Sequence, residues 1–110
     1  RAKHPAAHLG GTPPPPPPDT ARTFEELRER IRTCTSSLTT FHESDFAGAD
    51  ERKVAPKWLE GRWLRGKDYL ADVAVPNFFF HVTMAYAILR HNGVVLGKMD
   101  YIGTLPTQAA

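Results

Sequence analysis

The sequence predicts a mainly α-helical protein with one short β-hairpin, and three patterns predict it. The longest apolar run, residues 76–89, ends in the helix-stop sequence His91-Asn92-Gly93. The sequence Thr23-Phe-Glu-Glu26 is a capping box, in which the Thr and Glu side chains satisfy each other's backbone amides at a helix start. After this box, apolar residues recur at alternating spacings of three and four, which is the period of an amphipathic helix.

The first ten residues are expected to form a helix remnant that stops at Gly10-Gly11. His4 and His8 lie four residues apart, as two metal ligands on one helix face would. Pro5 and the fraying of a chain end favour two exposed histidines over such a site.

Residues 11–22 are expected to form a proline-rich crossover between two helices. The six prolines Pro13–Pro18 favour a polyproline II segment roughly 19 Å long. Such a run can be a ligand for SH3 or WW domains. We favour a stiff connector, because predicted helices flank it closely, and we expect no SH3 or WW partner.

Residues 23–41 are expected to form a helix with one apolar seam of the kind that packs along neighbouring helices in a bundle. Acidic and arginine residues alternate in its first half, which indicates a solvated face and no nucleic-acid partner. The seam residues are Phe24, Leu27, Ile31, Cys34, Leu38 and Phe41.

Cys34 is the single cysteine of the chain, so an internal disulfide is excluded and a reducing compartment is favoured. No cation or histidine near it in the sequence would activate the thiol, so we expect a buried structural residue. We expect the protein to be cytoplasmic.

Residues 51–65 are expected to form a hairpin with strands over 52–58 and 62–65. Pro56 cannot donate a backbone hydrogen bond and limits the first strand to a sheet edge. Trp58 and Trp63 are expected to close one end of the helix bundle, with an exposed binding patch as the alternative.

Residues 67–92 are expected to form one long helix kinked at Pro76, followed by a tail over 93–110 laid on the other helices. At 100° per residue, Asn77 and His81 lie one turn apart on the apolar half of this helix, where we expect a buried polar pair.

Two predicted long helices cannot cover the apolar half of the helix 67–92, so we expect an exposed apolar face and self-association, as a homodimer. That face is drawn from Phe78, Val82, Ala85, Ile88 and Leu89.

Length and composition agree with a single domain over residues 1–110, which is 41% hydrophobic and carries a net charge of +2. No run of apolar residues comes near the ~20 residues that a membrane-spanning helix needs, so we expect no membrane partner.

The motif from Pro76-Asn-Phe-Phe-Phe-His81 to Val94, with Leu96-Gly-Lys98, resembles the C-terminal signature of an uncharacterised family in the DinB/YfiT-like four-helix-bundle clan. The resemblance extends back through Asp19-Thr20 and Thr23-Phe24 to Arg1. It implies an incomplete up-down four-helix bundle, and this chain is expected to be the C-terminal part of a larger one.

The resemblance also implies where a metal would lie. The clan often binds a divalent metal through one early histidine and a His-x-x-x-His pair on the last long helix. His81 matches the second residue of that pair, Asn77 stands at the first, and the early ligand would lie near or before Arg1. Because an amide is a poor ligand for zinc or nickel, we expect no cofactor.

Two functions follow from the resemblance and the residues. The first is a non-catalytic helical-bundle protein. The second is a metal-dependent enzyme of the clan's kind, a thiol transferase or hydrolase, with a divalent metal on His81. No other residue is assigned a catalytic role. Asp68 and Asp72 lie four residues apart on the outer face, where a solvated pair is expected.

Overall fold

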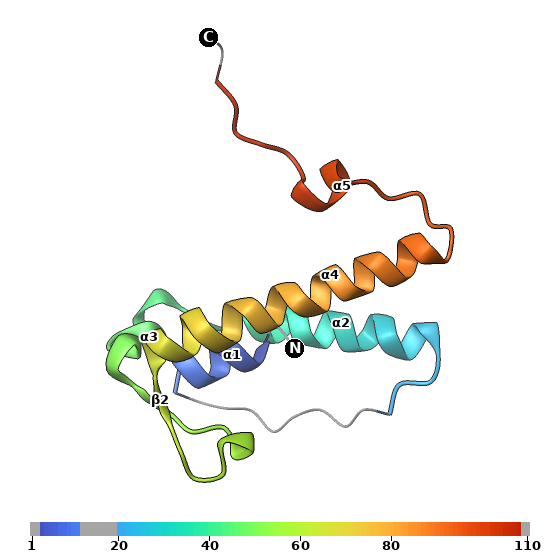
Figure 1. Ribbon diagram of the computed structural model, residues 1–110. Helices are drawn as coiled ribbons and strands as arrows, with labels where there is room; N and C mark the ends of the chain where they lie inside the picture. The colour runs from blue at the N-terminus through green and yellow to red at the C-terminus, as the bar shows by residue number, and fades with distance from the viewer. Residues whose placement is uncertain (1–2, 12–19, 109–110) are drawn as a thin grey trace. The chain divides into compact units, whose positions relative to one another are not determined.

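The computed structural model describes residues 3–11 and 20–108 and is mainly helical (Figure 1). The chain divides into two compact units, Arg1–Phe78 and Phe79–Ala110. The single domain expected over residues 1–110 stays a prediction. The proline run Pro13–Pro18 lies outside the described residues, so its role as a connector or as an SH3 or WW ligand also stays a prediction.

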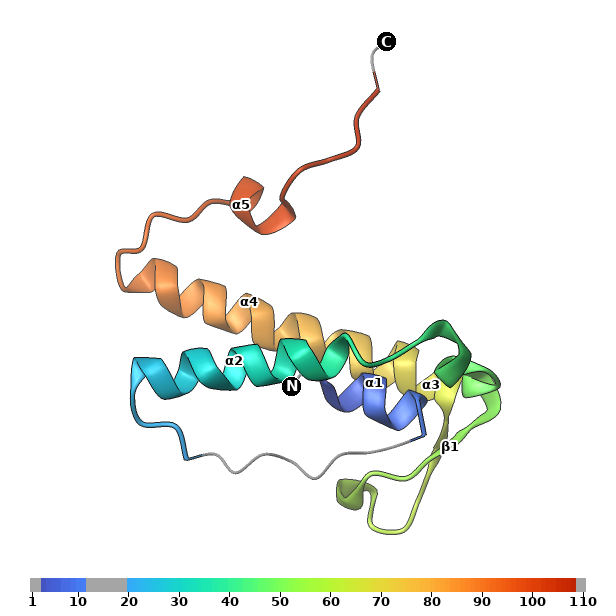
Figure 2. The same cartoon turned by 180° about the vertical axis from the view of Figure 1, so that it is seen from behind.

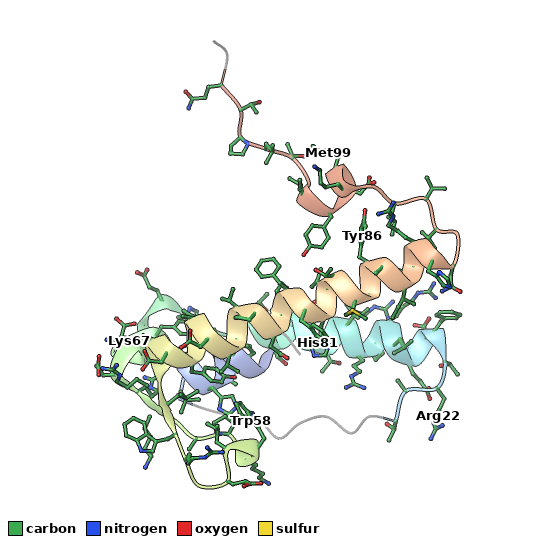
Figure 3. All side chains as sticks on the ribbon, in the orientation of Figure 1. Arg22, Trp58, Lys67, His81, Tyr86 and Met99 are labelled. Atoms are coloured by element: carbon green, nitrogen blue, oxygen red, sulfur yellow. The ribbon has the colours of Figure 1, made fainter. Side chains whose placement is uncertain are left out.

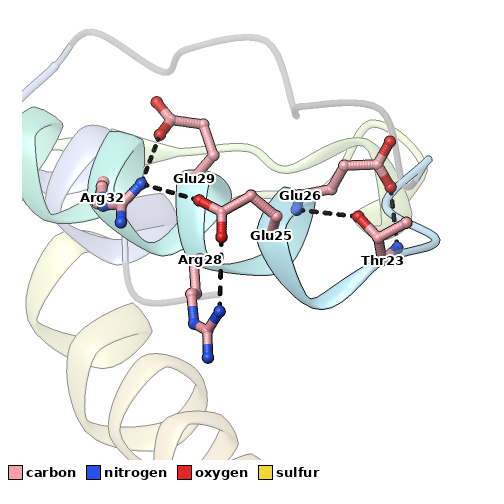
Figure 4. Close-up of polar contacts among 6 residues, drawn as sticks. All are labelled: Thr23, Glu25, Glu26, Arg28, Glu29 and Arg32. Carbon is pink, nitrogen blue, oxygen red and sulfur yellow. Dashed lines mark hydrogen bonds and ion pairs between the residues drawn. The ribbon is translucent and has the colours of Figure 1, made fainter.

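The first unit begins with helices α1 (Lys3–Leu9) and α2 (Phe24–Leu38). The predicted capping box is confirmed: Glu26 N donates to Thr23 Oγ1 at 3.2 Å, and Thr23 N donates to the Glu26 carboxylate at 2.9 Å (Figure 4). α2 ends three residues earlier than expected. The Ser and Thr hydroxyls of its last turns donate to the helix's own carbonyl groups, which weakens the continuation of the helix.

Two short 3-10 helices, η1 (Glu43–Phe46) and η2 (Ala49–Glu51), connect α2 to the hairpin. The Arg52 guanidinium holds this connection together, because it donates to the carbonyl oxygens of Asp45 and Ala47, each at 3.2 Å. Hydrogen bonds from a charged donor such as this guanidinium are among the stronger ones in proteins.

The predicted hairpin is present, but its strands are only two residues long. β1 (Lys53–Val54) pairs antiparallel with β2 (Leu64–Arg65), in the register Val54 opposite Leu64. The loop between them contains the 3-10 helix η3 (Lys57–Leu59). Pro56, which has no amide hydrogen for a strand ladder, lies just after β1 and accounts for the early end of that strand.

The expected long helix runs continuously from Gly66 to His91 through three segments. α3 (Gly66–Tyr69) leads into a π-helical turn, η4 (Leu70–Ala74), and then into α4 (Val75–His91). The irregular turn therefore precedes Pro76, at which a kink was expected. Proline at position 76 removes the amide that would bond to the carbonyl four residues earlier and crowds that carbonyl, so the wider turn forms there.

α4 ends as the sequence predicts. Val94 N donates to Leu89 O at 3.1 Å and Gly93 N donates to Arg90 O at 3.0 Å, which is the Schellman pattern. Gly93 has φ 85°, a left-handed conformation that glycine adopts without a steric penalty.

The buried core of the described chain lies in the first unit, where α1, the hairpin and α3 meet (Figures 1 and 2). Gly66 is buried there, and a Cβ atom on it would lie 1.8 Å from Ala49 O. Glycine at this position therefore lets the start of α3 approach the backbone of η2. The cluster consists of Leu9, Val54, Tyr69 and Ala74, with Phe46, Ala49, Leu64 and Val73 packed against it.

The second unit holds most of α4 and the short helix α5 (Lys98–Ile102). The Tyr86 hydroxyl donates to Gly97 O, and the Tyr86 and Tyr101 rings meet edge to face at 5.4 Å. Thr83 Oγ1 and the Tyr101 hydroxyl lie 3.2 Å apart. These contacts hold α5 against α4 within this unit, as expected for part of the tail.

One helical run in the described residues, Gly66–His91, is long and apolar enough to cross a membrane by length and composition alone. This corrects the expectation that no apolar run comes near that length. The expectation counted the apolar run from Pro76 only, whereas the helix begins at Gly66. The core helix of a soluble protein passes the same test, so the expected absence of a membrane partner stays a prediction.

Candidate functional site

Asn77 and His81 both lie on α4 (Val75–His91), one helical turn apart. Asn77 is exposed and His81 is half-buried. The His81 ring meets the Phe80 ring edge to face at 5.4 Å. The expected buried polar pair of Asn77 and His81 stays a prediction.

The expected absence of a metal site stays a prediction. Within residues 3–11 and 20–108, no three His, Cys, Asp or Glu side chains gather closely enough to hold a metal ion. Asn77 has a neutral amide at the position of the first histidine in the clan's His-x-x-x-His pair. Zinc and nickel favour imidazole and thiolate ligands over such an oxygen.

His8 lies in a position that the sequence patterns did not predict. Its ring meets the ring of buried Tyr69 edge to face at 5.5 Å. Burial lowers the pKa of the His8 imidazole, because the charged form is poorly solvated there, and it raises the pKa of the Tyr69 hydroxyl for the same reason. His8 was expected to be exposed, and its half-buried position against Tyr69 corrects that expectation. The expectation for His4 stays a prediction, because the His4 side chain lies outside the described part of the chain.

Trp58 and Trp63 do not close the end of a bundle in this chain. Their side chains are 60% and 49% exposed, and Trp58 lies on the loop of the hairpin (Figure 3). Lys53 Nζ lies 5.4 Å from the centre of the Trp63 ring, a cation–π contact. The exposed patch, the alternative considered for these residues, is therefore the arrangement that the structure shows.

The charged face of α2 is built as expected. Arg32 Nη1 lies 3.3 Å from the Glu25 carboxylate and 3.2 Å from that of Glu29, and Arg28 lies 3.5 Å from Glu25 (Figure 4). These pairs are exposed and add little to stability. Because they occupy these two arginines, they support the expectation of no nucleic-acid partner, which stays a prediction.

Two further candidates differ from their expectations. Cys34 was expected to be buried and is half-buried. No other residue of its helix, α2, is buried either. Asp68 is half-buried and accepts from Arg65 Nε at 3.0 Å, while Asp72 is exposed. The two carboxylates therefore lie in different surroundings, and the ion pair with Arg65 raises the pKa of that guanidinium.

A family described as "Domain of unknown function (DUF1993)" matches residues 1–102. The chain belongs to the DUF1993 family. A crystal structure of a DinB family member protein from Shewanella denitrificans matches this DUF1993 chain with a TM-score of 0.88 and 40% sequence identity. The resemblance noted from the motif of residues 76–98 is thereby confirmed, and the fold is DinB-like and helical. No curated protein matches the chain.

The match covers 99% of this DUF1993 chain and 62% of the Shewanella denitrificans chain. The chain thus spans less than two thirds of the length of its solved relative.

Proposed function

We propose that this DUF1993 protein is a non-catalytic helical protein that lacks the transition-metal site of the DinB/YfiT-like clan and works as a homodimer. The lack of a metal site is supported by the two residues at the positions of the clan's histidine pair. His81 supplies one imidazole, while the residue one turn before it, Asn77, supplies an exposed amide. One imidazole and one amide do not make a tight site for zinc or nickel.

The experiment is elemental analysis of the untagged full-length protein after native purification. We expect much less than one zinc or nickel per chain. Asn77→His is the matched variant, because it restores two imidazoles four residues apart on one helix face, and it should bind zinc more tightly in a titration. One equivalent of metal in the unaltered protein, lost on His81→Ala, would overturn the proposal.

That contrary result would favour the second candidate, a metal-dependent thiol transferase or hydrolase with His81 as a ligand. The observation in its favour is the likeness to a solved DinB family member over nearly the whole chain. Such an enzyme would need two further metal ligands, and their positions would lie outside the described residues or on another chain.

The apolar surface of α4 supports the proposed homodimer. All five residues of the predicted apolar face are exposed, including Ile88 at 57%, and α4 has no buried residue. Exposed apolar residues also occur on other sides of this helix, including Phe79 and Phe80. A helix that is apolar on all sides is normally covered by other protein or by lipid, so a monomer with this surface open to water is disfavoured.

α2 also exposes apolar residues, along the seam predicted from its sequence. This seam begins with Phe24, which is 83% exposed, and no residue of the helix is buried. Sedimentation of the full-length protein over a hundredfold range of concentration tests the homodimer. We expect a dimer that dissociates on dilution, whereas a monomer at every concentration would contradict the proposal.

A further inference from the structure

The hairpin presents an ordered surface to solvent. Its loop is closed by backbone hydrogen bonds from Leu59 N to Pro56 O at 2.9 Å, from Glu60 N to Lys57 O at 3.1 Å and from Arg62 N to Leu59 O at 3.0 Å. This bonding holds the backbone that carries the two exposed tryptophans, Trp58 and Trp63. Tryptophans held in this way lose little conformational entropy on binding and are frequent anchors of protein interfaces.

Cations precede both tryptophans in the sequence, Lys57 before Trp58 and Arg62 before Trp63. We define the hairpin surface as Lys53, Lys57, Trp58, Arg62 and Trp63. Its three cations make no ion pair with any described residue: Lys53 lies over the Trp63 ring, and Arg62 Nε donates to Leu59 O at 3.2 Å. The loop carries one acidic residue, Glu60, so the surface is aromatic with a net positive charge.

An acidic segment of the same unit, residues 42–51, carries the opposite charge. It contains four carboxylates and no Lys or Arg. The Asp45 carboxylate accepts from His42 N at 2.8 Å, and Glu51 lies 3.7 Å from Lys67 Nζ. The other two carboxylates, Glu43 and Asp50, are exposed and pair with no described cation. The 3-10 helices η1 and η2, held by Arg52, fix the backbone of this segment.

The two surfaces are neighbours in the sequence, yet the hairpin cations do not pair with the acidic residues of their own chain. In a twofold dimer the same surface of both copies forms the interface, so a group i of one copy meets a group j of the other and every contact occurs twice. Complementary charges carried by one molecule suit this symmetry, because each copy offers both halves of the contact. A second copy of this chain therefore fits the hairpin surface by charge.

We propose that the hairpin surface binds the acidic segment 42–51 of a second copy of this chain, with Lys57 and Arg62 facing Glu43 and Asp50. This inference rests on the proposed homodimer and names the residues that orient it. The apolar helix α4 favours association without selecting one orientation, whereas fixed charges on a rigid loop select one.

Charge reversal in the full-length protein tests the pairing. The basic variant Lys57→Glu/Arg62→Glu and the acidic variant Glu43→Lys/Asp50→Lys should each dimerise at least about tenfold more weakly, since reversed charges repel at both copies of the contact. A mixture of the two variants should recover most of the affinity as a heterodimer in native mass spectrometry. Arg28→Glu/Lys98→Glu changes the charge equally outside both surfaces and should dimerise like the unaltered protein.

Trp58→Ser supplies a readout independent of charge and should also weaken the dimer, with helix content by circular dichroism unchanged. Reversal variants that dimerise normally, or a mixture that recovers no affinity, would overturn the hairpin contact while leaving the proposed homodimer in place. An unaltered protein that stays monomeric would overturn both.

Discussion

Gly66 has no room for a side chain. A Cβ atom there would lie 1.8 Å from the carbonyl oxygen of Ala49, which is backbone and cannot move aside alone. We expect Gly66→Ala to lower the free energy of unfolding by about 3 kcal/mol, because η2 and α3 would have to separate. Gly48→Ala is the control: Gly48 has φ 68° with open space around it, so only the conformational cost of about 1 kcal/mol applies. Equal losses in thermal or urea unfolding would contradict the close approach.

His8 makes stability depend on pH in the mildly acidic range. Its pKa is lower in the folded protein than the ordinary value of 6.5, because burial disfavours the charged imidazole. The unfolded chain therefore binds more protons below about pH 6.5, and stability falls as the pH falls through that value toward the folded pKa.

Urea unfolding at a series of pH values measures this dependence. The variant His8→Gln, which does not titrate, should lose less stability than the unaltered protein between about pH 7 and 5. Parallel pH profiles for the two proteins would show that His8 is solvated in the folded state.

At the residue scale, local patterns predicted local chemistry and little beyond it. The capping box and the Gly93 stop follow from neighbours within a few residues, so they could be read from the sequence. The His8–Tyr69 contact and the Gly66–Ala49 approach join segments distant in the chain, and no periodicity reports them. The Asn77–His81 pair was placed on the correct helix, but its burial depends on what covers α4, which helical periodicity does not specify.

At the scale of elements, α2 depends on its N-terminal cap more than most helices do, because none of its residues is buried. Thr23→Ala removes the acceptor of Glu26 N and should lower the stability of this helix by about 1 kcal/mol. Thr33→Ala, in the middle of the same helix, should be neutral or stabilising, since alanine has the better helix propensity. Circular dichroism during thermal unfolding measures both variants. A larger loss for Thr33→Ala would show that the cap does not hold the helix.

The hairpin and the long helix show where element predictions fail and why. The alternation of apolar residues in 52–58 predicted a strand, but Pro56 limits β1 to two residues and the tryptophans turn to solvent. In the long helix, Pro76 was expected to be the kink, whereas the π-helical turn Leu70–Ala74 absorbs its effect one turn earlier. In both cases a proline changed hydrogen bonding at a position other than its own.

For the whole molecule, the motif of residues 76–98 predicted the family, and the helical DinB-like fold follows from it. Periodicity alone would have predicted two long helices and a hairpin without their arrangement. The extent of the exposed apolar surface was underestimated, since a single face of α4 was expected and several sides are exposed. A helical-wheel analysis ranks the sides of a helix by their relative polarity. On a helix with few polar residues it identifies only the most apolar side, even when several sides must be covered by other groups.

The last prediction concerns that surface. Leu89→Glu places a charge on the predicted apolar face of α4, and Arg90→Glu places the same group on the side that carries Thr83, Tyr86 and Arg90. If other protein covers the apolar face, Leu89→Glu buries an unpaired carboxylate at a cost of several kcal/mol, and the protein should dissociate or unfold at a lower temperature. Arg90→Glu should lose only the few tenths to about 1 kcal/mol expected for an acidic group at a helix C-terminus. Sedimentation and thermal unfolding of the full-length variants distinguish these outcomes. A Leu89→Glu protein that assembles and melts like the unaltered one would show that this face of α4 remains open to water.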